Sequence, residues 1–112
     1  MTNIRVAIAT GDAVLKYVDT DTTVGSNGNG DSPIPSTTRV IAVHAVASAA
    51  GSYSVKGQKQ ITNKTAEGTA IKFQVAANEA TDMYMGEMGV PVYGVVSVSA
   101  PTDGGVLTAI LG

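Results

Sequence analysis

Hydrophobic and polar residues alternate along several short stretches of this chain, most clearly just after its midpoint. There Ile71, Phe73 and Val75 are apolar. The residues between them, Lys72 and Gln74, are polar. Successive side chains leave an extended backbone on opposite faces, so this period of two predicts a half-buried antiparallel strand. No stretch sustains the apolar stripe of an amphipathic helix, with a period of 3.6 residues.

Two pairs of strand-like runs predict hairpins. Near the C-terminus, the β-branched runs 93–100 and 106–111 flank a Pro-Thr-Asp-Gly-Gly segment, which is typical of a hairpin loop. Near the N-terminus, a Gly-Asp pair separates the alternating residues 4–8 from the run 13–18. The sequence therefore predicts a short N-terminal hairpin within residues 1–18 and a second hairpin at the other end.

A long polar segment divides the N-terminal hairpin from the rest of the chain. Residues 19–37 are rich in Gly, Asn, Asp and Pro, which suit neither a helix nor a central strand, so a loop is expected there. The main body is then 38–112. Eight or nine short strands at roughly ten-residue spacing indicate an all-β, single-domain antiparallel β-sandwich or barrel, similar to a jelly roll.

The main body begins with a run, 38–47, that is apolar on both faces. Four β-branched residues among seven favour a strand over a buried helix, and a strand of this kind is covered on both sides or lies at an oligomer contact. In it, His44 is expected to share a face with Val40, Ala42 and Val46. Further expectations are a turn at 50–51, a strand at 52–56, a weaker polar strand at 58–63, a turn at 65–68, and a loop or one helical turn at 76–82.

Composition narrows the classes of function. The 112 residues include one Phe and no Trp, which suits a thin sandwich core better than a deep cofactor pocket. The net charge is −2 and the seven basic residues are scattered, whereas a nucleic-acid binder needs a clustered cationic face. No apolar run is long enough to span a membrane. The absence of Cys excludes disulfides and thiolate chemistry.

Few residues offer a catalytic or metal-binding pattern. His44 is the single histidine and has no Cys or Asp at motif spacing, which indicates a hydrogen-bonded or interface histidine. Asp19, Asp21 and Asp31 lie in the polar loop, but that loop lacks the glycine and the terminal Glu of a calcium-binding EF-hand. No Ser-His-Asp arrangement can be assembled from local motifs. We therefore expect no enzyme activity, no metal and no cofactor.

One cluster favours a protein-binding role. Residues 82–93 contain three of the four methionines and two of the four tyrosines. Methionine adapts its shape and tyrosine has an amphipathic ring, so both are common at interfaces. Core filling is the alternative, and both can hold for opposite faces of one strand. The candidate interface residues are Met83, Tyr84, Met85, Met88, Val90 and Tyr93.

Three stretches carry a resemblance to a known class of protein. They are Gly-Ser-Tyr at 51–53, the strand-like segment 68–77, and residues 94–99 with the expected Gly-rich final hairpin. Their strand rhythm and glycine placement resemble small β-rich virion proteins of tailed bacteriophages, most of all the head decoration, or cement, proteins. The resemblance implies a non-enzymatic homotrimer that clamps the lattice of the major capsid protein, with no nucleic-acid or membrane partner.

The first residues lack the features of a signal peptide, which is consistent with a virion protein made in the host cytoplasm. Two other functions remain open. One is another small virion component, such as a head fibre base or a tail part. The other is a carbohydrate-binding module, in which exposed Tyr17, Tyr53 or Tyr84 would stack on sugar rings, although Trp is usually the strongest stacking residue and is absent.

Overall fold

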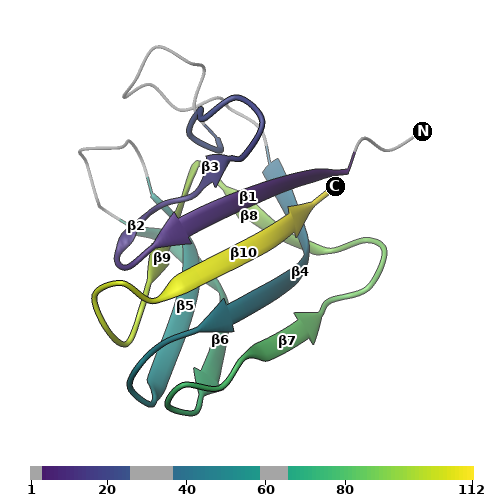
Figure 1. Cartoon of the computed structure of the whole chain (residues 1–112). Coiled ribbons are helices and arrows are strands. Elements are labelled where there is room, and N and C mark those ends of the chain that lie inside the picture. Colours follow the sequence, from purple (N-terminus) through teal and green to yellow (C-terminus); the bar gives the residue numbers. More distant parts are fainter. Residues whose placement is uncertain (1–3, 26–36, 59–65) are drawn as a thin grey trace.

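A computed structural model describes residues 4–25, 37–58 and 66–112. Within these residues the chain forms ten strands and no helix, arranged as two antiparallel sheets that pack face to face (Figure 1). The predicted all-β sandwich is confirmed, with ten strands instead of eight or nine. The strands are β1 (Arg5–Thr10), β2 (Ala13–Val14), β3 (Lys16–Tyr17), β4 (Thr37–Val46), β5 (Gly51–Gln58), β6 (Ala66–Val75), β7 (Thr81–Tyr84), β8 (Val90–Tyr93), β9 (Val95–Ser99) and β10 (Val106–Leu111).

Each sheet combines strands from different parts of the chain. Sheet A has the order β3-β1-β10-β4-β7, and β8 also pairs with β4. Sheet B has the order β2-β9-β5-β6. In sheet A, β1 pairs with β10 along its whole length, from Arg5 opposite Leu111 to Thr10 opposite Val106. The first and last strands therefore lie side by side in the middle of the sheet (Figure 1).

Small side chains from sheet A meet larger ones from sheet B in the core. The inner face of β1 contributes Ala7 and Ala9, which are at most 3% exposed. Opposite, the rings of Tyr53 and Phe73 stack with centroids 5.7 Å apart. The Tyr53 hydroxyl donates a hydrogen bond to the Val46 carbonyl oxygen at 2.9 Å, and burial raises the pKa of this phenol. The β1 alanines and the two aromatic rings thus belong to one buried core between the sheets.

The predicted C-terminal hairpin is wrong, because β9 belongs to sheet B and β10 to sheet A. The six-residue connection, 100–105, crosses between sheets that stack about 10 Å apart, a distance that an extended segment of this length spans. Asp12 accepts a hydrogen bond from the Ala100 amide at 2.7 Å, and Gly11 donates to the Gly105 carbonyl at 2.6 Å. The turn after β1 therefore holds the crossing in place.

The N-terminal hairpin is also more complex than predicted. β2 joins sheet B beside β9, whereas β3 returns to sheet A and pairs with β1, with Ala7 opposite Tyr17. Between them Leu15 is fully buried. The run 13–18 looks like one strand in sequence, but the chain changes sheet at Leu15. The turn at Gly11, with φ of +65°, lies where the sequence indicated.

Several local expectations need correction. Residues 66–68 belong to β6 and not to a turn, and β7 begins at Thr81, inside the expected loop or helical turn. A register shift between Ile110 and Leu111 in the pairing of β10 with β4 turns Val40 to the inner face, so Val40 does not share a face with His44. Thr37, assigned to the polar loop, starts β4. Most of that loop, 26–36, and most of the expected polar strand, 59–63, lie outside the described residues.

Arg5 joins β1 to the segment that follows β3. Its guanidinium donates to the Asp19 carboxylate at 2.9 Å and to the Thr20 hydroxyl at 3.3 Å, and it lies 3.5 Å from the centre of the Tyr17 ring. The hydrogen bond from Arg5 holds the pKa of Asp19 below its usual range. Arg5 thus fixes the position of β3 at the edge of sheet A.

We predict that Gly57→Ala destabilises the fold much more than Gly104→Ala. A Cβ at Gly57 would overlap the Tyr93 carbonyl oxygen, so the backbone must shift, at a cost of about 3 kcal/mol or more. At Gly104 no atom lies within 4 Å of an added Cβ, and the φ of +82° alone costs about 1–2 kcal/mol. Urea denaturation measures both variants. Equal losses of stability would contradict the close approach of β5 to β8.

We predict a pH-dependent effect for Asp19→Asn. Because the pKa of Asp19 is lower in the folded chain than in the unfolded chain, its carboxylate stabilises the fold above the unfolded pKa, near 3.8. That stability disappears as the pH falls through the lower, folded pKa. The melting temperature of the variant should therefore lie below that of the wild type at pH 7, and the two should converge at acid pH. Asp103→Asn, which removes an exposed carboxylate, is the control for net charge.

Candidate functional site

The outer face of sheet B is polar. Ser52 lies opposite Gln74, and the Gln74 side-chain amide donates to the Ser52 hydroxyl at 2.9 Å. Ser54 lies between Lys72 on β6 and Ser99 on β9. An antiparallel sheet that faces water on one side normally has this composition. The described part of the outer face of sheet B therefore suits contact with water.

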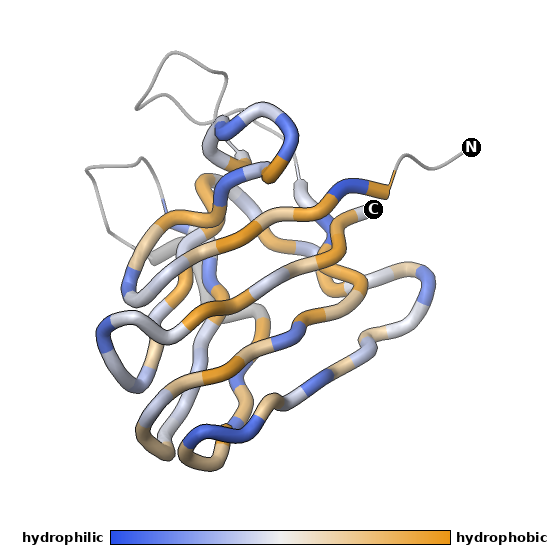
Figure 2. The backbone as a smooth tube through the Cα atoms, in the orientation of Figure 1, coloured by the Kyte–Doolittle hydropathy of each residue, from blue (hydrophilic) through white to orange (hydrophobic). Residues whose placement is uncertain are grey.

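The outer face of sheet A has the opposite character. Cross-strand pairing places its side chains in rows that run from β1 through β10 and β4 to β7. Val6 and Ile8 are each 39% exposed and Tyr84 is 67% exposed, so large apolar side chains face water. Figure 2 shows apolar residues along β1 and β10. The rows are Val6, Ile110, Ala42 and Tyr84; Ile8, Thr108, His44 and Asp82; and Thr10, Val106 and Val46.

His44 and Asp82 form the polar part of this face. The imidazole Nδ1 lies 2.5 Å from an Asp82 carboxylate oxygen, and the two side chains are 52% and 78% exposed. His44 is thus a hydrogen-bonded histidine on a sheet face. Sequence reasoning missed Asp82, since it lies 38 residues from His44 and in a segment predicted to be a loop. In the part of the chain that the structure describes, no three His, Cys, Asp or Glu side chains gather into a possible metal site.

A shallow hollow of about 320 Å³ lies on the sheet B side, between β2, β5 and β9. Its lining includes Asp12, Lys56, Ser97 and Ser99. The Asp12 carboxylate already accepts the Ala100 amide, and the Ser97 hydroxyl lies 3.4 Å from the Lys56 carbonyl. The polar groups of this hollow thus serve the crossing loop and the sheet, and they form no catalytic arrangement.

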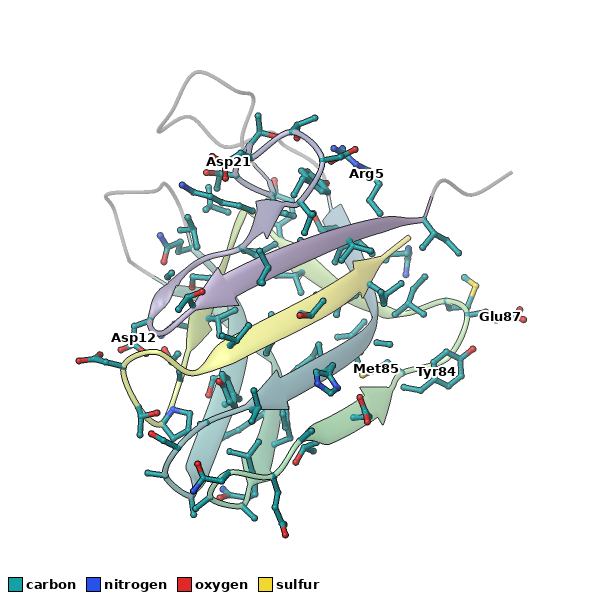
Figure 3. All side chains as sticks on the ribbon, in the orientation of Figure 1. Arg5, Asp12, Asp21, Tyr84, Met85 and Glu87 are labelled. Atoms are coloured by element: carbon teal, nitrogen blue, oxygen red, sulfur yellow. The ribbon has the colours of Figure 1, made fainter. Side chains whose placement is uncertain are left out.

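The candidate interface residues separate into two groups. Met83, Met85 and Val90 are half-buried and pack against the core. Tyr84, Met88 and Tyr93 are 67%, 73% and 55% exposed. We call these last three the β7–β8 rim. Figure 3 shows Tyr84 and Glu87 at the edge of the molecule beside β7. Alternation along β7 and β8 explains the division, and the sequence left both roles open.

The rim lies on a backbone that several hydrogen bonds hold. The Met85 amide donates to the Ile41 carbonyl at 2.7 Å. The Gly89 amide donates to the Gly86 carbonyl at 3.0 Å. The Arg39 guanidinium donates to the Met88 carbonyl at 3.1 Å. The exposed side chains therefore project from ordered backbone: Tyr84 from β7, Met88 from the turn and Tyr93 from β8.

The three tyrosines proposed for sugar stacking are not equally accessible. Tyr53 is fully buried, so its expected exposure is wrong. Tyr17 is half-buried, and the Arg5 guanidinium covers one face of its ring. Only Tyr84 among the three presents a largely exposed ring.

Comparisons with protein-family models, curated proteins and solved structures found no match to this chain. Across the described residues, none of the secondary structure is a helix of the length and hydrophobicity that crossing a membrane requires.

We predict that neutral His44 carries its ring proton on Nδ1. Asp82 accepts a hydrogen bond at that nitrogen and therefore favours this tautomer, which leaves Nε2 as an acceptor. Long-range ¹H–¹⁵N correlation spectra distinguish the two tautomers. Asp82→Ala should shift the proton toward Nε2, whereas Asp103→Ala should not. A wild-type His44 protonated only on Nε2 would contradict the observed pair.

Proposed function

We propose that this chain is a structural protein of a tailed-phage particle, and specifically a decoration protein that binds the capsid lattice of the head. The resemblance in strand rhythm and glycine placement suggests the class of protein. The observation that carries the proposal is the β7–β8 rim, where Tyr84 of β7, Met88 of the connecting turn and Tyr93 of β8 project into water.

The rim has the chemistry of a protein-binding surface. A thioether adapts to the shape of its partner, and a phenol buries an apolar ring while its hydroxyl stays hydrogen-bonded. Because the turn is already held by its backbone bonds, binding orders few further groups, which reduces the entropic cost. Many copies on a lattice, or several contacts made by one oligomer, would make a modest contact long-lived.

The same rim suits another small virion component, such as a head fibre base or a tail part, so the test must include the head itself. A carbohydrate-binding module is less well supported. Of the tyrosines that would stack on sugars, Tyr53 is buried and Tyr17 is covered by Arg5.

We predict that Met88→Ser combined with Tyr93→Ser weakens binding to phage heads by at least about tenfold, as expected for the loss of central interface anchors. The assay is cosedimentation with expanded heads that lack this protein, assembled from the major capsid protein of the same phage. The wild type should also raise the resistance of the heads to heat. Both side chains are more than half exposed, so the variant should fold normally.

The control is Lys72→Ser with Glu79→Ser, which changes two exposed side chains outside the rim. It should bind heads as the wild type does. Failure of the wild type to bind heads, together with saturable binding to a sugar array, would overturn the proposal in favour of a carbohydrate-binding module.

A further inference from the structure

Two rows on the outer face of sheet A continue across β1 to the segment at β3. Lys16 lies opposite Ile8, and the Val18 amide donates to the Val6 carbonyl at 2.9 Å. Cross-strand neighbours share a face, so Lys16 and Val18 extend the rows that contain Ile8 and Val6. The first complete row is Val18, Val6, Ile110, Ala42 and Tyr84; the second is Lys16, Ile8, Thr108, His44 and Asp82.

The two ends of each row carry chemically complementary side chains. The first row is apolar at both ends, since Val18 is 60% exposed and Tyr84 is 67% exposed. The second row has a cation, Lys16, at the β3 end and an anion, Asp82, at the β7 end. Four strand spacings, about 19 Å, separate these charges, so in one copy they interact little through salt water.

We infer that this face binds a second copy of the chain, around a twofold axis parallel to β10. Such an axis exchanges the two edges of the sheet while each row keeps its level. Lys16 of one copy then meets Asp82 of the other, and Val18 meets Tyr84. The contact is isologous, so each of these pairs forms twice.

The positions of the charged side chains favour this axis over a twofold axis that also lies parallel to the sheet but runs perpendicular to the strands. A twofold axis perpendicular to the strands would place β3 on β3, and thus Lys16 near Lys16 and Asp82 near Asp82. Like charges placed together at an interface are strongly unfavourable. The parallel axis instead gives two attractive pairs and brings the apolar ends of the first row together.

Two polar groups of the face, Asp82 and Thr108, keep hydrogen-bond partners when water is removed. Asp82 accepts from His44 within one copy and can accept from Lys16 of the other, so neither charge is buried alone. Thr108 lies on the central strand, where the axis brings it against its own equivalent, and two hydroxyls can donate and accept in turn. The remaining central positions, Val6, Ile110 and Ala42, are apolar.

The area of the face is sufficient for a specific contact. Five strands at about 4.8 Å spacing and three levels of side chains cover a projected area of about 500 Å² per copy. Two copies contribute about 1,000 Å², which is near the lower limit for a biological interface. Two sheet faces that pack in this way align within about 30° and lie about 10 Å apart.

Tyr84 belongs both to the rim and to this face, so the head test uses only Met88 and Tyr93, and the inference does not depend on binding to a phage head. It differs from the homotrimer that the resemblance implies, since an isologous face joins two copies. If heads are not bound but the pair forms, only the proposed function fails.

The experiment is sedimentation equilibrium of the full chain at low salt, over micromolar to hundreds of micromolar concentrations. The wild type should reach about twice the monomer mass of 11.3 kDa. Lys16→Glu and Asp82→Lys should each weaken the pair at least tenfold, and the double variant K16E/D82K should restore it to within about threefold of the wild type. Because Asp82→Lys also removes the bond to His44, Val6→Lys provides a second test and should abolish the pair.

Lys72→Glu reverses a charge on the outer face of sheet B and should leave the association unchanged. Far-ultraviolet circular dichroism and urea denaturation establish that each variant is folded. The inference is overturned by a wild type that stays monomeric throughout, by a trimer, by a dimer that Lys16→Glu and Val6→Lys do not affect, or by a double variant that stays as weak as the single ones.

Discussion

The pairing of β1 with β10 is the contact on which the rest of sheet A depends. It sets which side chains of the first strand face the core, because a slip of one residue would exchange the two faces. In the observed register Ala7 and Ala9 are buried, while Val6 and Ile8 lie outside. It also places β10 between β1 and β4, so the rows that cross the sheet exist only in this register.

On β1 the small side chains face the core and the larger aliphatic side chains face water, which reverses the usual arrangement. Its inner side chains are alanines, which belong to the same buried core as Tyr53 and Phe73 of sheet B. Its larger aliphatic side chains lie on the surface, where the fold gains less from them. The outer face of sheet B, by contrast, carries polar side chains that face water. Burial against the second copy inferred above would remove Val6 and Ile8 from water.

Local pattern was sufficient to predict the strands but not the sheets to which they belong. Alternation at Ile71, Phe73 and Val75 indicates a strand whatever its neighbours are, so the all-β class follows from it. A Gly-rich connection such as 101–105 looks the same whether it closes a hairpin or crosses between sheets, so the position of β9 was not predictable. The pairing of His44 with Asp82 depends on β4 meeting β7 across 38 residues, which no local signal encodes. The division of the 82–93 cluster into exposed and half-buried side chains follows, for its strand residues, from the alternation along β7 and β8 alone.

The adjacency of Arg5 and Leu111 also determines how the fold responds to mechanical force. A pull applied to the two ends of the chain acts at the same end of the β1–β10 ladder. The load therefore falls on one pair of residues at a time and opens the hydrogen bonds in sequence, instead of shearing them all together. Force between the termini would separate sheet A near its middle at low load.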